Sequence, residues 1–94
     1  MTFEEIRERF MALAEDDYRA FNEKLQTSSS PQIGVRVGEV RKTARELAKD
    51  DWRGYVQGLN DSYYYEEKLT AGMSIYYSKA DIDEKLEYTE KFIP

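Results

Sequence analysis

Hydrophobic residues recur every three or four positions along most of this chain, which is the spacing of amphipathic helices. The first stripe consists of Phe3, Ile6, Phe10, Leu13 and Ala14. Thr2, followed three residues later by Glu5, has the spacing of a capping box and predicts a helix start. The stripe keeps its phase as far as Leu25, so residues 3–26 are predicted to form either one long helix or two helices joined near residues 15–17.

A connector interrupts the helical pattern at about residues 26–34. It contains three serines together with Pro31 and Gly34, and these residue types oppose continuation of a helix. Beyond it, a second apolar stripe predicts a helix that begins at Val37; its members are Val37, Val40, Ala44, Leu47 and Ala48.

Three further helices are predicted in the second half of the chain. A short one follows Asp50 or Asp51, either of which can serve as its N-cap. A longer one covers about residues 63–78, with an apolar face formed by Tyr65, Leu69, Met73, Tyr76 and Tyr77. Asp81 and Glu84 frame a capping box that begins a last helix reaching the end of the sequence.

Short helices joined by short connections favour antiparallel neighbours. No segment has the pattern of a strand, so the sequence predicts an all-α fold of paired helical hairpins over residues 37–59 and 62–93. The two pairs share no obvious residue-level repeat, so the prediction of a stacked array depends on element lengths alone.

Composition narrows the possible chemistry. The 94 residues make one small domain, and they include neither cysteine nor histidine. Disulfides, Cys/His zinc sites and histidine relays are therefore excluded, and we expect no metal and no cofactor. The run Asp81-Ile82-Asp83-Glu84 lacks the glycine of a calcium loop.

The chain has no apolar stretch of membrane-spanning length, and its first residues are charged and amphipathic. We therefore expect a soluble, cytoplasmic protein without a membrane segment. The net charge of −5 argues against an independent nucleic-acid-binding domain.

Paired carboxylates can perform acid and base catalysis, but nearly all of the pairs here stand at predicted helix starts. Capping explains them there, because a carboxylate accepts hydrogen bonds from free N–H groups and faces the positive end of the helix dipole. Glu66 and Glu67 fall within the first turns of their helix, where the pattern favours a solvated face over catalysis.

Two clusters could contact nucleic acid. The tyrosine-rich run over residues 62–77 could stack on bases, although core and interface packing is favoured because adjacent tyrosines point in different directions. Arg41, Arg45 and Lys49 lie one helical turn apart and could contact phosphates. Acidic residues interleaved with them favour instead a salt-bridged solvent face; these are Glu39, Glu46, Asp50 and Asp51.

Residues 31–49 resemble a hallmark stretch of the DNA alkylation repair family, the HEAT-like-repeat DNA glycosylases. The shared pattern comprises Gly34-Val35-Arg36, Val40-Arg41 and Ala44, and the similarity extends to residues 18–25 and 64–69. The resemblance implies a HEAT-like α-α superhelix of stacked hairpins. It also implies binding of double-stranded DNA and metal-free hydrolysis of the N-glycosidic bond of alkylated purines.

The family's catalytic Trp-x-x-x-Asp motif has no counterpart here, because Trp52 is the only tryptophan and no aspartate stands four residues after it. No catalytic residue is therefore assigned. Residues 1–94 are interpreted as the N-terminal part of a single HEAT-like domain, inactive alone and bound to DNA through the full-length protein. Phe21, which matches an aromatic residue facing the DNA groove in the family, joins Arg41 and Arg45 as a candidate DNA-binding residue.

The alternative function is a non-enzymatic helical-repeat module that binds a protein partner through its tyrosine-rich helix, a role that suits the acidic charge. A repeat array that ends in mid-stack exposes the apolar edge of its last helix. We therefore also expect residues 1–94 to self-associate or to be marginally stable.

Overall fold

The structure is a computed structural model that describes residues 1–25, 30–61 and 64–93, and in these ranges it contains helices and no strand. The helices are α1 (Phe3–Leu13), α2 (Asp16–Leu25), α3 (Val37–Ala48), α4 (Trp52–Gln57), the 3-10 turn η1 (Gly58–Asp61), α5 (Tyr65–Tyr77) and α6 (Ile82–Phe92). The predicted all-α fold is confirmed. Residues 26–29 of the predicted connector and residues 62 and 63 lie outside the described residues.

Residues 3–25 form two helices, which decides between the two alternatives left open by the pattern. Ala14 leaves α1 with an extended backbone, at φ −63° and ψ 136°. The backbone N–H of Glu15 then donates to the carbonyl of Gly34 at 3.0 Å, so the break between α1 and α2 is fixed by a contact with the distant connector.

Side-chain caps begin three of the helices. Thr2 Oγ1 accepts from Glu5 N at 3.1 Å, and the Glu5 carboxylate accepts from Thr2 N in return, so the predicted capping box is confirmed. Asp51 Oδ1 accepts from Gly54 N at 3.0 Å, and Asp81 Oδ1 accepts from Glu84 N at 2.9 Å. Capping therefore explains these carboxylates.

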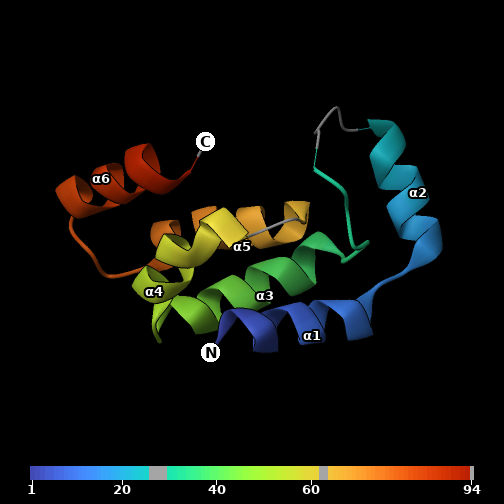
Figure 1. Ribbon diagram of the computed structural model, residues 1–94, viewed down its shortest axis with the longest axis horizontal. Helices are drawn as coiled ribbons and strands as arrows, with labels where there is room; N and C mark the ends of the chain where they lie inside the picture. Colours follow the sequence, from blue (N-terminus) through green and yellow to red (C-terminus); the bar gives the residue numbers. More distant parts are fainter. Residues whose placement is uncertain (26–29, 62–63, 94) are drawn as a thin grey trace.

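Two helical hairpins, α3 with α4 and α5 with α6, stack on each other (Figure 1). The most extensive packing joins α3 to α5, which lie side by side and run in the same direction, and α4 also contacts α6. Equivalent helices of successive hairpins are thus neighbours, which is the arrangement of a helical-repeat stack.

The core lies where α1 packs across α3, α4 and α5. Ile6 and Phe10 of α1 are fully buried, and Phe3 stacks on Tyr55 of α4 with 5.1 Å between ring centroids. The buried apolar cluster consists of Ile6, Phe10, Ile33, Val35, Val40, Leu47, Trp52, Tyr55, Val56, Leu59, Ala71 and Ile75.

The buried face of α5 is not the apolar face that its sequence predicts. The buried positions are Glu66, Glu67, Thr70, Ala71, Ser74 and Ile75, whereas Tyr76 is 74% exposed. Thr70 and Ser74 donate their hydroxyl hydrogens to backbone carbonyls of α5 itself, at 2.7 and 2.8 Å. Short side chains with internal hydrogen bonds let α5 approach α3 closely.

Two helices, α2 and α6, contribute no buried residue. Four of their apolar side chains remain open to solvent: Phe21 is 60% exposed, Leu25 66%, Ile82 68% and Leu86 52%. Tyr88 and Phe92 of α6 are partly buried against the core. Among the described helices, none combines the length and apolar character needed to cross a membrane.

Candidate nucleic-acid interface

The residues before α3 wrap around a buried carboxylate from α5. Glu66 Oε1 accepts from the backbone N–H of Ile33 at 2.9 Å, and its Oε2 accepts from Gly34 N at 2.8 Å and from Val35 N at 3.1 Å. The side chain is 2% exposed. Three successive backbone donors thus converge on one carboxyl group, which fixes the path of the chain into α3.

Gly34 is required by this path. Its φ of +98° is a conformation that L side chains rarely adopt. A Cβ atom there would lie 2.7 Å from Cβ of Arg19 and 2.8 Å from the carbonyl oxygen of Glu15. The glycine therefore permits both the left-handed backbone and the close approach of α2.

Arg36 completes the attachment of α2. Its guanidinium donates to both carboxylate oxygens of Glu15, at 3.1 and 3.2 Å, and lies 4.7 Å from the ring centroid of Tyr18. The arginine lowers the pKa of Glu15, and the hydrogen-bonded carboxylate raises the pKa of Arg36. The Gly-Val-Arg triplet therefore joins α2, α3 and α5, and its arginine has a structural partner.

Glu67 is fully buried and anchors the other side of the junction. Arg7 of α1 donates to it from Nε at 2.8 Å and from Nη2 at 2.9 Å, and this pairing raises the pKa of Arg7. The hydroxyl of Tyr55 donates to the Glu67 backbone carbonyl at 3.1 Å, and burial raises the pKa of Tyr55. The prediction of a solvated face for Glu66 and Glu67 is wrong, because both carboxylates organise the core.

The basic residues of α3 are not paired with the acidic residues interleaved among them. Glu46 bonds to Arg9 of α1, Asp50 to the amino group of Met1, and Asp51 caps α4. Within the described residues, Arg41, Arg45 and Lys49 have no ion-pair partner. The predicted exposure of these cations to solvent is confirmed, whereas the predicted ion pairs with the interleaved acidic residues are not found among the described residues.

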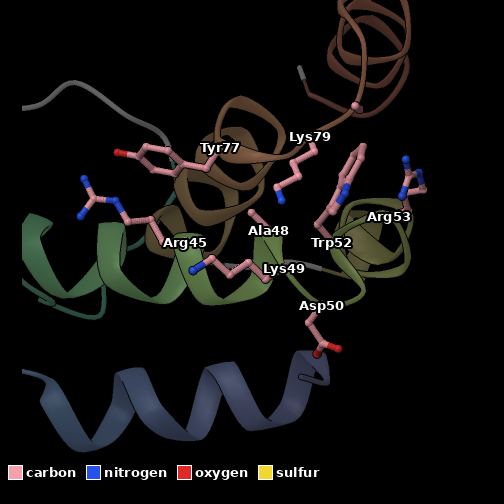
Figure 2. Close-up of a pocket in the computed structure, with 9 residues that line it drawn as sticks. Arg45, Ala48, Lys49, Asp50, Trp52, Arg53, Tyr77 and Lys79 are labelled. Carbon is pink, nitrogen blue, oxygen red and sulfur yellow. The ribbon is translucent and has the colours of Figure 1, made fainter.

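A cavity of about 570 Å³ opens where the C-terminal ends of α3 and α5 meet the start of α4 (Figure 2). We call it the α3–α5 cleft; its lining residues are Arg45, Ala48, Lys49, Asp50, Trp52, Arg53, Tyr77, Lys79 and Ala80. The Arg45 guanidinium lies 5.0 Å from the ring centroid of Tyr77. The cleft thus combines cations with aromatic side chains.

Two of the charges in the α3–α5 cleft are already neutralised. Arg53 donates to both carboxylate oxygens of Glu84, at 2.7 and 2.8 Å, and lowers the pKa of that carboxyl. The amino group of Met1 holds the pKa of Asp50 below its usual value. In the described part of the chain, the cleft cations without an ion-pair partner are Arg45, Lys49 and Lys79.

The three predicted DNA-binding residues do not form one site. Arg41 and Arg45 are exposed on successive turns of α3, and Arg45 lines the cleft. Phe21 belongs to α2, which lies beyond the N-terminal end of α3 (Figure 1). The sequence pattern named Tyr77 in a tyrosine-rich run and Trp52 as the single tryptophan, but it did not place them with Lys79 beside Arg45. Helical spacing relates residues on one helix and does not relate them to the face of another. No cluster of carboxylates able to hold a metal ion occurs within the described residues.

These features define a helical-repeat protein with an exposed basic and aromatic cleft. The chain belongs to the DNA alkylation repair enzyme family, whose model matches residues 6–94. The family suggests a role in DNA alkylation repair. Neither the curated proteins nor the solved structures give a significant match.

Proposed function

We propose that residues 1–94 form the scaffold and one wall of the DNA groove in a DNA glycosylase that excises alkylated purines by hydrolysis of the N-glycosidic bond. The observation that carries this proposal is the family match over residues 6–94. In this proposal the chain is the N-terminal part of a single HEAT-like domain.

The exposed basic residues of α3 support contact with DNA. Arg41 and Arg45 are exposed, and two acidic residues near them bond elsewhere, Glu46 to Arg9 and Asp50 to the amino group of Met1. Cations held at a surface without an ion-pair partner can replace the counterions of a phosphate backbone. This local excess of positive charge supports DNA binding despite the net charge of −5.

The test is release of 3-methyladenine or 7-methylguanine from alkylated duplex DNA by the full-length gene product and by residues 1–94. We expect release by the full-length product and none by residues 1–94, since this chain has no Trp-x-x-x-Asp motif. Release by residues 1–94 would refute the assignment of catalysis to residues outside this chain. No release by the full-length product would refute the glycosylase.

A helical-repeat module that binds a protein partner is the second candidate. It is favoured by the exposed apolar side chains of the second hairpin, where Tyr76 is 74% and Ile82 68% exposed. DNA binding that weakens with salt distinguishes the two, because phosphate contacts release counterions. Binding that is absent or insensitive to salt favours the protein-binding module.

A further inference from the structure

We infer that the α3–α5 cleft binds a phosphate group through Arg45, Lys49 and Lys79, and that this group is a phosphodiester of the DNA backbone. The second half of the inference rests on the proposed function. The α3–α5 cleft would be a contact site to which both hairpins contribute, whereas the candidate DNA-binding residues Arg41 and Arg45 belong to one helix.

Positive charge is concentrated in the cleft although the chain as a whole is acidic. The sequence has 14 basic and 19 acidic residues. The cleft is nevertheless lined by four basic residues and by Asp50 alone among the acidic ones. Because Asp50 and Arg53 are paired with other groups, a net positive field remains in the cavity.

Ordinary helix stabilisation explains only part of this cluster of cations. Cations near the C-terminal end of a helix interact favourably with its carbonyl groups, and this effect accounts for Arg45 and Lys49 on α3. It does not account for the convergence of Lys79, which follows α5. In Figure 2 the side chain of Lys79 extends from α5 toward Ala48 on α3 and Trp52 on α4.

The side chains that line the cleft determine which ligand it can recognise. Apart from the paired Asp50, the charged side chains that line it are cationic, and among the described residues the lining contains no asparagine, no glutamine and no glutamate. Tyr77 and Trp52 form its aromatic walls, and the ring of Tyr77 is already covered by Arg45. An excess of unpaired cations suits an anionic group, and the phosphates of the backbone receive half or more of the hydrogen bonds that proteins make to DNA.

The exposed lysines can be changed without disturbing the fold, since Lys49 and Lys79 make no side-chain hydrogen bond or ion pair within the described ranges. The test variant is Lys49→Gln/Lys79→Gln. The matched control, Lys42→Gln/Lys91→Gln, removes the same charge from exposed positions outside the cleft. Lys49→Arg/Lys79→Arg retains the charge within it.

Binding of a fluorescent duplex to residues 1–94 is measured by anisotropy over a salt series. The logarithm of the binding constant falls as the logarithm of salt concentration rises, and each lost phosphate contact makes this slope shallower by about 0.9. The slope of the double glutamine variant should therefore be shallower by about 1.8, and the variant should bind roughly tenfold or more weakly at low salt. The arginine variant should keep the wild-type slope. If the double glutamine variant behaves like the matched control, the α3–α5 cleft is not the phosphate site, although the chain still binds DNA.

A second arm uses inorganic pyrophosphate and the fluorescence of Trp52, the single tryptophan of the chain and a lining residue of the cleft. We expect pyrophosphate to change the emission and duplex DNA to displace it. Pyrophosphate binding without displacement would retain a phosphate site but overturn the DNA contact. No change in Trp52 emission together with no duplex binding would overturn the inference entirely.

Failure of the proposed function gives a different result. If the full-length product releases no alkylated base while duplex binding still depends on Lys49 and Lys79, the cleft stands as a DNA-backbone site. The glycosylase alone would then be rejected.

Discussion

The central junction and the outer helices of this molecule are held in different ways. At the junction, Glu66 and Glu67 are almost completely buried, and each has charged or backbone donors on its oxygens. On the outside, α2 and α6 bury no residue. Stability is therefore concentrated where α5 meets α1 and the segment before α3.

The outer helices are attached through exposed contacts. Arg36 with Glu15 connects α2, and Arg53 with Glu84 connects α6. Exposed ion pairs contribute little to folding, because water and salt screen them. The aromatic contact of Trp52 with Tyr88, at 5.0 Å between ring centroids, adds packing for α6. We therefore expect that the outer helices can be changed, or can meet partners, with little effect on the central junction.

Glu66→Ala tests the junction and should give the largest effect. It leaves three buried N–H groups without their acceptor, at a cost of roughly 3 kcal/mol or more in the free energy of unfolding. For a domain of this size, the midpoint of thermal unfolding should fall by about 12 °C or more. Thermal unfolding followed by circular dichroism measures this midpoint.

Two controls make the Glu66 result specific. Glu66→Gln keeps one acceptor oxygen and should lose less stability than the alanine variant. Glu87→Ala removes an exposed carboxylate from α6 and should stay within about 0.5 kcal/mol of wild type. If Glu66→Ala and Glu87→Ala unfold at the same midpoint temperature, the central role of the junction is contradicted.

Gly34→Ala should have the next largest effect. The alanine must adopt a φ of +98° against the backbone of α2, and such strain costs about 1–3 kcal/mol. Gly38→Ala is the matched control, because a Cβ there meets nothing within 4 Å on a helix. That control should stabilise by about 0.5–1 kcal/mol. Urea denaturation checks both, and a Gly34→Ala variant as stable as wild type would show that the segment can relax.

Leucine truncations on the outer helices should have the smallest effect on stability. Leu25→Ala and Leu86→Ala alter side chains that are 66% and 52% exposed, so we expect changes within about 0.5 kcal/mol. Leu47→Ala, at a fully buried position, is the control for truncation of a core leucine and should lose more stability than either outer variant.

The outer truncations should also weaken self-association, if the open apolar faces of α2 and α6 mediate it. Sedimentation velocity over a concentration series measures this. A wild-type chain that stays monomeric at every concentration and unfolds cooperatively would contradict the predicted self-association.

Helix positions could be predicted from sequence because caps and periodicity are local. The caps at Thr2, Asp51 and Asp81 follow directly from residue type and spacing. The buried face of α5 could not be predicted in this way. Burial of Glu66, Thr70 and Ser74 depends on partners that only the folded chain supplies, and no buried side-chain nitrogen or oxygen among the described residues lacks a hydrogen-bond partner.

The candidate site was predictable only in part. Arg41 and Arg45 follow from spacing on one helix, but their freedom from ion pairs does not. Glu46 is bonded to Arg9, which lies 37 residues earlier in the chain. Lys79 reaches the α3–α5 cleft because α5 lies parallel to α3, a relation that local sequence patterns do not encode.

The short side chains on the buried face of α5 have a geometric consequence. Thr70, Ala71 and Ser74 let α5 lie close against α3, whereas α4 and α6 touch less extensively. A stack whose layers differ in spacing curves toward the closer layer, so we expect the concave side to follow α3 and α5. Ala71→Leu would widen the inner layer and flatten that curvature, which small-angle scattering can detect.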